Sequence, residues 1–303
     1  MPMTPRQRVL AAINHEEPDR VPIVIGASNG ASLKARPYRR LKSPLSIVIL
    51  LLIIGFTTTF PACGRFGGIS PAPRVNPELA QVPAGWFWMG EDDGRQSNQP
   101  RHRIYLDAFE IMKKEVTREE FARFVSETGY HAAGWEGSLP EETDGLPAVG
   151  ILWKDADACC RWLGMRLPSE AEWEKAARGE DGLRYPWGDV WDAQKANTAE
   201  RGVGEVINTG SIPEGASPYG LFDMCGNAAE WVSDYYEPDY YSSSPERNPT
   251  GPELIMDHVL RGGSFASPHE QATTYFRDSS HSVRPNLRVG FRCARSISGT
   301  PAP

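Results

Sequence analysis

The tryptophans of this chain are confined to one stretch of the sequence. All nine lie between Trp86 and Trp231 of a 303-residue chain that also contains 29 glycines and 26 prolines. Tryptophan supplies a large buried surface per residue, whereas glycine and proline interrupt helices and strands and favour turns. This combination predicts a folded domain in that stretch, with tight aromatic packing and much irregular chain.

The charge and the cysteine pattern disfavour two classes of function. The net charge is -7, and no run dense in Lys or Arg occurs in the tryptophan-containing part; the sequence therefore predicts no nucleic-acid partner. The six histidines show no spacing typical of metal ligands and the cysteines form no CxxC pair, so no zinc cluster is expected. The five cysteines are Cys63, Cys159, Cys160, Cys225 and Cys293.

Residues 39–63 have the pattern of an export signal. Residues 45–56 are apolar and uncharged; this is shorter than the roughly 20 residues of a spanning helix but fits the core of a secretory signal. Basic residues precede this stretch, as expected on the cytoplasmic side of a membrane. Cys63 follows it, and the whole resembles a bacterial lipoprotein signal with Cys63 as the lipidated residue, although Phe60 and Pro61 depart from the usual box.

Two other interpretations of this segment stay open, an uncleaved membrane anchor and a buried core segment. A lipoprotein signal and an uncleaved anchor both imply that the protein is exported to the bacterial cell envelope. We therefore expect a membrane partner, through a lipid anchor or the hydrophobic segment, and a domain that faces the periplasm or the cell surface.

The first 38 residues do not fit such a signal. Residues 3–23, MTPRQRVLAAINHEEPDRVPI, resemble the opening of the uroporphyrinogen decarboxylase and related methyltransferase family. That family is a barrel, which needs roughly 250 residues, so this fragment implies neither a barrel activity nor an independent fold. We expect the working protein to start near Leu41; a fusion remnant and an amphipathic helix without function are the alternatives.

The remainder divides into a Gly- and Pro-rich linker at 64–79, a domain at 80–296 and a tail at 297–303. A linker of that composition is typical of a tether. In the domain, the apolar run 82–90 predicts a buried opening strand.

Three helices are predicted in the domain, and glycines end them. Their ranges are 117–128, 154–163 and about 169–179. Thr117 with Glu120, and Ser169 with Glu172, have the spacing of capping boxes at two of the starts. The expected fold class is α+β, with two or three helices, short strands and much irregular chain.

Several motifs occur in a fixed order along the domain. They are RLPSEAEWEKAARG (166–179), YPWGD (185–189), AN (196–197), SPYGLFDMCGNAAEWVSD (217–234), RGGSF (261–265) and VGFRCAR (289–295). Together they resemble the formylglycine-generating enzyme (sulfatase-modifying factor) family over residues 80–296. The resemblance implies a variant of the C-type lectin fold. The family also includes iron enzymes of ergothioneine synthesis, pyoverdine-maturation proteins and gliding-motility lipoproteins.

Members of this family that make formylglycine hold copper with two cysteines after the GGS segment. Here no Cys occurs between Gly262 and Arg292. The two positions fall near Ser267 and near His269 or Ala272, and neither Ser nor Ala binds Cu(I) as a thiolate does. Because this chain departs from the family pattern at both cysteines, we expect no catalytic residues, no copper and no formylglycine formation.

Iron is not expected either. In the ergothioneine branch the ligands come largely from a helical domain for which this sequence shows no counterpart. His258, His269 and His281 are near one another in sequence, but single loop histidines are more often surface or hydrogen-bonding residues. Ser264 is expected to donate or accept hydrogen bonds, because no GxSxG motif or paired base accompanies it.

Calcium is the cofactor that the resemblance favours. The segment DMCGNAAEW offers the carboxylates of Asp223 and Glu230 and the carbonyls of Gly226 and Ala228, which are ligands that calcium prefers. Alternatively, Glu230 pairs locally while Trp231 lies in the core.

A second family calcium site would begin at Asn197 and the carbonyl of Thr198. Its acidic partner would be near Glu205, although the spacing there departs from the family pattern.

The resemblance also implies a ligand cleft and a disulfide. The cleft residues expected are Ser264, Ser267, His269, Arg277 and Arg292, with Asn286 and Arg288 close by. The arginines either bind an anion or hold loops by hydrogen bonds to carbonyls. In the family, a cysteine on the helix before RLPSEAEW pairs with the one in GFRC, which here implies Cys160 with Cys293.

Two functions follow from these patterns. The first is a membrane-tethered binding or structural module, whose cleft takes a peptide, a protein or a small ligand while calcium stiffens the loops. The second is a divergent oxidoreductase or a protein- or peptide-modifying enzyme, as in the pyoverdine-maturation or iron-enzyme branch. Whether any catalysis remains is left open.

Overall fold

The computed structural model describes residues 76–133, 135, 145–253, 256–281 and 283–297. All of them belong to one compact unit of the chain. The α-helices among them are α2 (Arg118–Thr128), α3 (Trp153–Trp162) and α4 (Glu170–Arg178). The strands are β1 (Leu79–Val82), β2 (Gly85–Met89), β3 (His102–Leu106), β4 (Phe109–Met112), β5 (Ala229–Tyr235), β6 (Asp257–Arg261), β7 (Asp278–His281), β8 (Val289–Phe291) and β9 (Ala294–Ser296).

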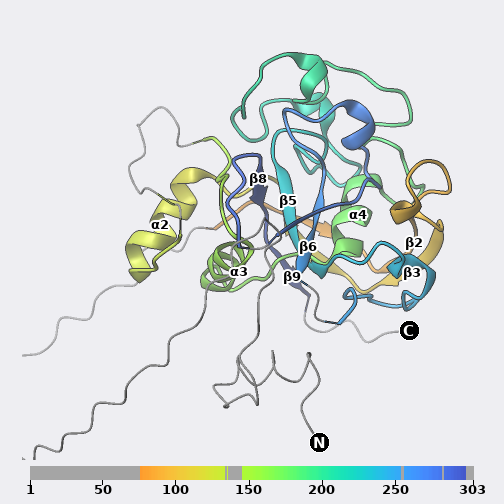
Figure 1. Cartoon of the computed structure of the whole chain (residues 1–303), viewed down its shortest axis with the longest axis horizontal. Helices are drawn as coiled ribbons and strands as arrows, with labels where there is room; N and C mark the ends of the chain where they lie inside the picture. Colours follow the sequence, from red (N-terminus) through yellow and green to blue (C-terminus); the bar gives the residue numbers. More distant parts are fainter. Residues whose placement is uncertain (1–75, 134, 136–144, 254–255, 282, 298–303) are drawn as a thin grey trace, which may run out of the picture. The chain divides into compact units, whose positions relative to one another are not determined.

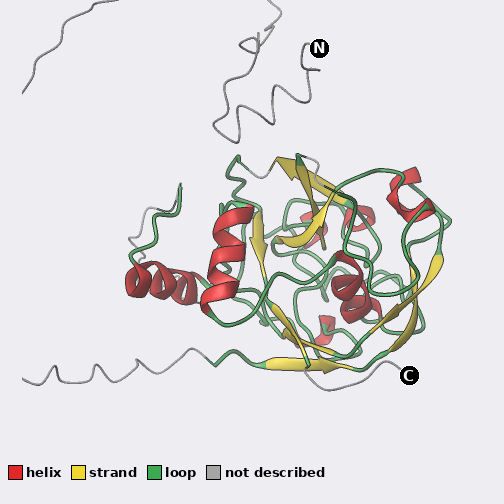
Figure 2. Cartoon of the chain, turned by 90° about the horizontal axis from the view of Figure 1, so that it is seen from below, coloured by secondary structure: helices red, strands yellow, loops and turns green. Residues whose placement is uncertain are grey.

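The strands form three small sheets. The largest has the order β7-β6-β5-β8, in which β5 and β8 are parallel and the other pairs antiparallel. A three-stranded sheet has the order β1-β4-β9, and β2 pairs only with β3 among the described strands. Irregular chain makes up much of the rest (Figure 2). The predicted α+β class with short strands is confirmed.

Helices cover both faces of the four-stranded sheet. Successive residues of a strand point to opposite faces, and Trp231 and Val232 of β5 accordingly belong to different hydrophobic clusters. Val232 packs in the cluster that contains Trp173 of α4, whereas Trp231 packs with residues of α2, α3 and β8. Figure 1 shows α4 beside β5 and β6, with α2 and α3 on the other side.

The predicted helix starts and stops are confirmed for two helices. The Thr117 side chain accepts the N–H of Glu120, whose carboxylate accepts the N–H of Thr117, and Gly129 ends α2 with φ 66°. Ser169 and Glu172 make the same reciprocal pair at the start of α4. Each box satisfies two backbone donors that a helix leaves unpaired. The third helix, α3, begins one residue before its predicted range and has no side-chain cap.

The disulfide implied by the family resemblance is present. Cys160 of α3 and Cys293, which follows β8, are joined across a sequence separation of 133, with their Cα atoms 5.5 Å apart. The bond ties α3 to the edge of the sheet. Cys159 and Cys225 are buried free thiols.

The prediction of a buried opening strand was wrong in part. The run 82–90 contains the end of β1 and all of β2, and β2 is buried on one face only. Trp86 and Trp88 are 37% and 40% exposed. Arginine side chains of the paired segment cover them instead, with the Arg103 guanidinium 5.1 Å from the Trp86 ring and that of Arg101 5.0 Å from Trp88. Such cation–π contacts stabilise half-exposed tryptophans.

The export signal, the lipidation of Cys63, the N-terminal fragment and the linker fall on residues 1–75, outside the described part of the chain. In the part that is described, no helix combines the length and the hydropathy that crossing a bilayer requires.

Candidate functional site

A small polar cavity lies where the chain leaves β6. Gly262 and Gly263 have φ of 84° and 68°, in the left-handed region that favours glycine. A Cβ atom on Gly263 would lie 2.6 Å from the carbonyl oxygen of Gln271, so only glycine fits here without a backbone shift. This tight turn leads directly into Ser264, which is 4% exposed.

Ser264 and Ser267 line the cavity together, as the family resemblance implied. Ser267 Oγ accepts the backbone N–H of Ser264 at 3.0 Å and lies 3.3 Å from Ser264 Oγ. The cavity has a volume of about 180 Å³, below the roughly 300–1,000 Å³ of sites for larger ligands. It can therefore accept one side chain or a small polar molecule.

Further polar residues that line this cavity come later in the chain. They are Gln271, Asp278, Asn286 and Arg288. Asn286 and Arg288 were expected beside the cleft, but Gln271 and Asp278 were not. Asp278 reaches the cavity because β7 pairs with β6, where Asp278 is opposite Leu260, and the sequence alone gives no signal for that pairing.

The positions near which the family cysteines would fall, Ser267 and either His269 or Ala272, are in different surroundings, and the cavity lining includes neither His269 nor Ala272. Ser267 faces the cavity, but Ala272 is fully buried in a cluster with Tyr185, Ala196 and Cys225. Only the first of these positions is therefore open to a ligand in the cavity.

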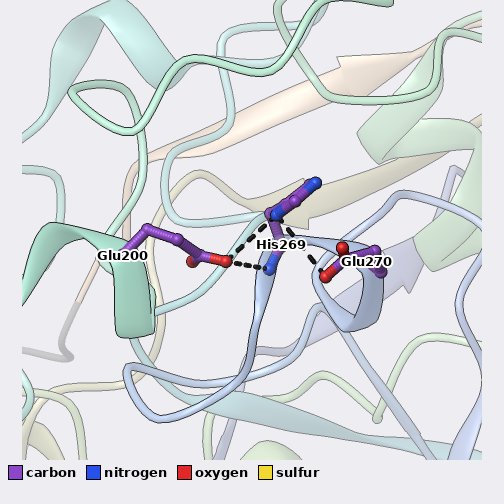
Figure 3. Close-up of side chains that lie close together, drawn as sticks. All are labelled: Glu200, His269 and Glu270. Carbon is purple, nitrogen blue, oxygen red and sulfur yellow. Dashed lines mark hydrogen bonds and ion pairs between the residues drawn. The ribbon is translucent and has the colours of Figure 1, made fainter.

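His269 does not line the cavity, contrary to its prediction as a cleft residue. Its Nδ1 lies 3.0 Å from Glu200 Oε1 and 3.4 Å from Glu270 Oε2 (Figure 3), and the Trp191 ring stacks on it at 5.0 Å. Although burial acts to raise it, hydrogen bonds from the His269 backbone N–H and the Thr198 hydroxyl lower the pKa of Glu200 to about 2.

Arg277 is not in the cleft either. Its side chain is fully buried, and its Nε donates to Glu170 Oε1 at 2.7 Å. Nη1 donates to the carbonyl oxygens of Ser97 and Glu237. Of the two roles that the sequence left open for the arginines, Arg277 therefore has the loop-holding one.

Arg292 has the same structural role. It is fully buried and pairs with Glu230 through two hydrogen bonds of 2.7 Å. Its other donors reach the carbonyl oxygens of Met112, Lys113 and Phe222. The prediction of Arg292 as a cleft residue was wrong, because a carboxylate 62 residues away holds its side chain in the core.

Glu230 is thus held by protein donors. Besides Arg292, the Trp173 indole N–H donates to Glu230 Oε2 at 2.9 Å. Trp231 is buried in the core, as in the alternative to a calcium site, but the local pairing of Glu230 in that alternative was wrong. The partner is distant in sequence rather than local.

Three buried carboxylates gather around this arginine. Glu115 accepts hydrogen bonds from Asn227 Nδ2 at 2.7 Å and from the Ala228 N–H at 3.0 Å. Burial, reinforced by the charges of Asp223 and Glu230, raises the pKa of Glu115 well above its usual range. Burial likewise raises the pKa of Asp223 to about 6. Sequence reasoning missed Glu115. This residue follows β4 after two lysines, Lys113 and Lys114, and belongs to none of the motifs.

The backbone of the motif segment runs directly beside Asn197. A Cβ atom on Gly226 would lie 2.3 Å from the Asn197 carbonyl oxygen, so the close approach requires glycine. Asn197 Nδ2 donates to the Glu205 carbonyl and to Asn227 Oδ1. Asn197 Oδ1, in contrast, is buried and lacks a hydrogen-bond partner in the described structure.

Thr198 and Glu205 contribute to this region through their backbones. The Thr198 carbonyl accepts the N–H of Arg201 in a short 3-10 turn, and its hydroxyl donates to Glu200. The carboxylate of Glu205 is on an exposed residue, and its carbonyl rather than its side chain contacts Asn197.

Comparison with known proteins agrees with this architecture. The sulfatase-modifying factor enzyme 1-like domain model matches residues 65–297. The chain belongs to this family, which is also called the formylglycine-generating enzyme family. The resemblance of its N-terminal fragment to the decarboxylase family stays a prediction.

Relatives with different names share the domain. The formylglycine-generating enzyme of Streptomyces coelicolor is 33% identical over 79% of this chain and 96% of its own length. The serine/threonine-protein kinase Pkn1 of Chlamydia trachomatis is 35% identical over 76% of this chain. The chain spans about two fifths of the length of the kinase relatives that it matches. A mouse relative named inactive Cα-formylglycine-generating enzyme 2 is 31% identical over 75% of this chain and 88% of its own length.

Solved structures support the fold. PvdO from Pseudomonas aeruginosa superposes with a TM-score of 0.64 at 27% identity, covering 73% of this chain and 95% of PvdO. Treponema denticola variable protein 1 superposes with a TM-score of 0.62 at 21% identity, covering 72% and 95%. The second similarity concerns the fold alone.

Proposed function

We propose that this protein is a ligand-binding module of the formylglycine-generating enzyme family that does not use the family's copper chemistry. The observation that carries the proposal is what occupies the positions of the two family cysteines. No Cys occurs between Gly262 and Arg292, Ser267 faces the cavity and Ala272 is buried in the core. Neither a hydroxyl nor a methyl group replaces a thiolate ligand of Cu(I).

The chemistry of the cavity supports recognition of a small polar group. Two hydroxyls, the Asp278 carboxylate and the Arg288 guanidinium surround about 180 Å³, with Phe276 and Val289 as apolar walls. A peptide side chain with both donors and acceptors fits this lining better than an apolar one, because buried polar groups need partners. The partner is therefore a peptide, a protein segment or a small polar molecule.

Calcium is the ion that we propose for the carboxylate-rich region. Asp223, which accepts one hydrogen bond from the Gly210 N–H, is the side chain that we propose to hold it, together with the carbonyls of Gly226 and Ala228 and the unpaired Oδ1 of Asn197. The nearby carboxylate of Glu115 accepts hydrogen bonds on both oxygens. Glu230, also expected as a ligand, already accepts hydrogen bonds on both oxygens. Bound calcium would neutralise the excess charge and stiffen the loops that frame the cavity.

A lipid anchor at Cys63, or the apolar segment before it, would hold this module in the bacterial cell envelope. The basic, apolar and cysteine-terminated pattern of residues 39–63 supports that placement. The disulfide of the domain supports it independently, because disulfides persist mainly in oxidising compartments.

The test is a direct assay of the missing reaction. The full-length chain, supplied with copper and oxygen, is incubated with a CxPxR peptide, and the mass of the peptide is measured. The Streptomyces coelicolor relative serves as the positive control. We expect no mass loss at the peptide cysteine with this chain, and a mass loss that depends on it would overturn the proposal.

The alternative is a divergent modifying enzyme that uses the same cavity. The 33% identity to the formylglycine-generating enzyme of Streptomyces coelicolor over 79% of this chain supports it. Metal analysis separates the two functions. One equivalent of copper or iron per purified chain would favour the enzyme, whereas calcium without either would favour the module.

A further inference from the structure

One group of side chains outside the cavity has the composition of a metal site. Glu200, His269 and Glu270 each offer one ligand atom, and these atoms lie within 4.8 Å of one another. Glu200 comes from the 3-10 turn Ala199–Arg201, and the other two begin the turn His269–Gln271. Figure 3 shows the two carboxylates approaching the imidazole from opposite sides.

Two of the three separations between the ligand atoms are close to those around a tetrahedral ion. Ligands about 2.0–2.2 Å from a tetrahedral zinc ion are separated from one another by roughly 3.3–3.5 Å. Here His269 Nδ1 is 3.0 Å from Glu200 Oε1 and 3.4 Å from Glu270 Oε2. The third separation, between the two carboxylate oxygens, is within 4.8 Å, so the side chains would close around an entering ion.

Neighbouring residues orient two of these ligands. The hydroxyl of the buried Thr198 donates to the other oxygen of Glu200 at 2.8 Å. The Trp191 ring stacks on the imidazole with 23° between the planes. Outer contacts of this kind fix ligand orientation in metal sites. Thr198 is two residues before Glu200, whereas Trp191 comes from a segment remote in sequence from His269.

We propose that Glu200, His269 and Glu270 bind a divalent transition metal ion of the zinc type. One imidazole nitrogen with two carboxylates suits such an ion, whereas calcium and magnesium prefer oxygen alone and Cu(I) prefers sulfur. The side chains of His269 and Glu270 are 31% and 64% exposed, which leaves coordination positions open to water or to a ligand.

This ion would lie at the rim of the cavity and apart from the carboxylate-rich region. The Ala199 N–H donates to the Ser267 carbonyl at 3.0 Å, which connects the turn carrying Glu200 to a cavity residue. Gln271, next to Glu270, lines the cavity itself. A ligand seated in the cavity could then reach the ion. The inference does not depend on the proposed binding function.

The experiment is a zinc titration of the full-length chain, purified in detergent without a histidine tag. The protein is stripped with a chelator and then kept in millimolar calcium, so that oxygen-only sites are occupied. Zinc affinity is measured by competition with a chromophoric chelator, and Co²⁺ replaces zinc to report the geometry through its visible absorption.

We expect one equivalent of zinc and the strong visible bands of tetrahedral Co²⁺. His269→Ala and Glu270→Gln should each weaken the affinity by roughly tenfold or more. His281→Ala is the matched control. Among the described residues, His281 pairs with a single carboxylate, that of Asp257, at 3.8 Å. The zinc affinity of this variant should match that of the unmodified chain.

Two results would overturn the inference. One is equal zinc affinity in the His269→Ala, Glu270→Gln and unmodified chains, which would leave only an ordinary ion pair between His269 and the glutamates. The other is the displacement of zinc by calcium. Both variants change exposed or half-exposed side chains, and their melting curves show whether the fold is retained.

Discussion

The domain buries charge in two places, and the balance of charge differs between them. Around α4, Glu170 and Glu174 contact the guanidinium groups of Arg178, Arg261 and Arg277, and all five side chains are buried. Two carboxylates there face three guanidinium groups. At the start of β5, Glu115, Asp223 and Glu230 are near a single guanidinium group, that of Arg292.

The pKa values reflect this difference. Burial alone would raise the pKa of Glu170, but the charges of Arg277 and Arg261 outweigh it and lower the pKa. Burial and the neighbouring carboxylates raise the pKa of Glu115 well above its usual range. An unpaired buried charge is costly. In the region around α4, arginines pair with the carboxylates of Glu170 and Glu174, so these carboxylates need no bound ion. In the carboxylate-rich region at the start of β5, three carboxylates share one arginine, so protons or a bound cation must balance the remaining charge.

The largest expected effect comes from one substitution made in both regions. Glu170→Gln leaves Arg277 and Arg261 without their shared carboxylate and should lower the free energy of unfolding by about 3–5 kcal/mol. Glu115→Gln removes a charge that already has like-charged neighbours, and in EDTA it should change the free energy by less than about 1 kcal/mol. Urea unfolding of both variants measures the contrast. Equal losses would remove the distinction between the regions.

A smaller effect is expected from pH in the absence of calcium. Burial raises the pKa of Asp223 to about 6 in the folded protein, above its ordinary value of 3.8. The folded state then binds the proton more tightly, so this stability is present below pH 4 and is lost as pH rises through 6. Melting temperatures in EDTA should fall over that window, and less so in Asp223→Asn.

Asp234 also contributes to the fall of the melting temperature with rising pH. Burial, together with the charge of Glu170, raises its pKa to about 7, so part of the fall should remain in Asp223→Asn and extend to higher pH. A slope that is the same in Asp223→Asn and in the unmodified chain would show that Asp223 does not titrate in the fold.

The smallest effect concerns an exposed ion pair that serves as a reference. Arg295 Nε lies 2.6 Å from Glu110 Oε2, as close as the buried pairs, but the two side chains are 51% and 29% exposed. Water and salt screen such a pair. Arg295→Met should cost less than about 1 kcal/mol by urea unfolding, and a loss as large as that of Glu170→Gln would show that burial is not what separates the pairs.

The parts of this structure that sequence patterns predicted depend on neighbours in the chain. Capping boxes join residues three apart, and the turn at Gly262 and Gly263 places Ser264 and Ser267 together within six residues. Family motifs extended this local information to the fold and to the Cys160–Cys293 bond.

The parts that were missed depend on distant partners. Arg277 was predicted in the cleft, but it pairs with Glu170 in the core. No local pattern could reveal this pairing, because the two residues are 107 positions apart. Trp86 is half-exposed and is covered by the guanidinium group of Arg103 on the neighbouring strand, β3, instead of by the core. Likewise, Glu200 and His269 are 69 residues apart, so the cluster that they form is visible only in three dimensions.

The central claim, our proposal that the carboxylate-rich region binds calcium, is tested most directly by calcium-dependent melting of the full-length chain. With calcium about 100-fold above its Kd, binding should add about 2.7 kcal/mol, which raises Tm by about 5–10 °C over EDTA for a domain of this size. Asp223→Asn should lose most of the rise, whereas Arg295→Met should keep it. An unchanged Tm in calcium, or an equal rise in Asp223→Asn, would contradict the account.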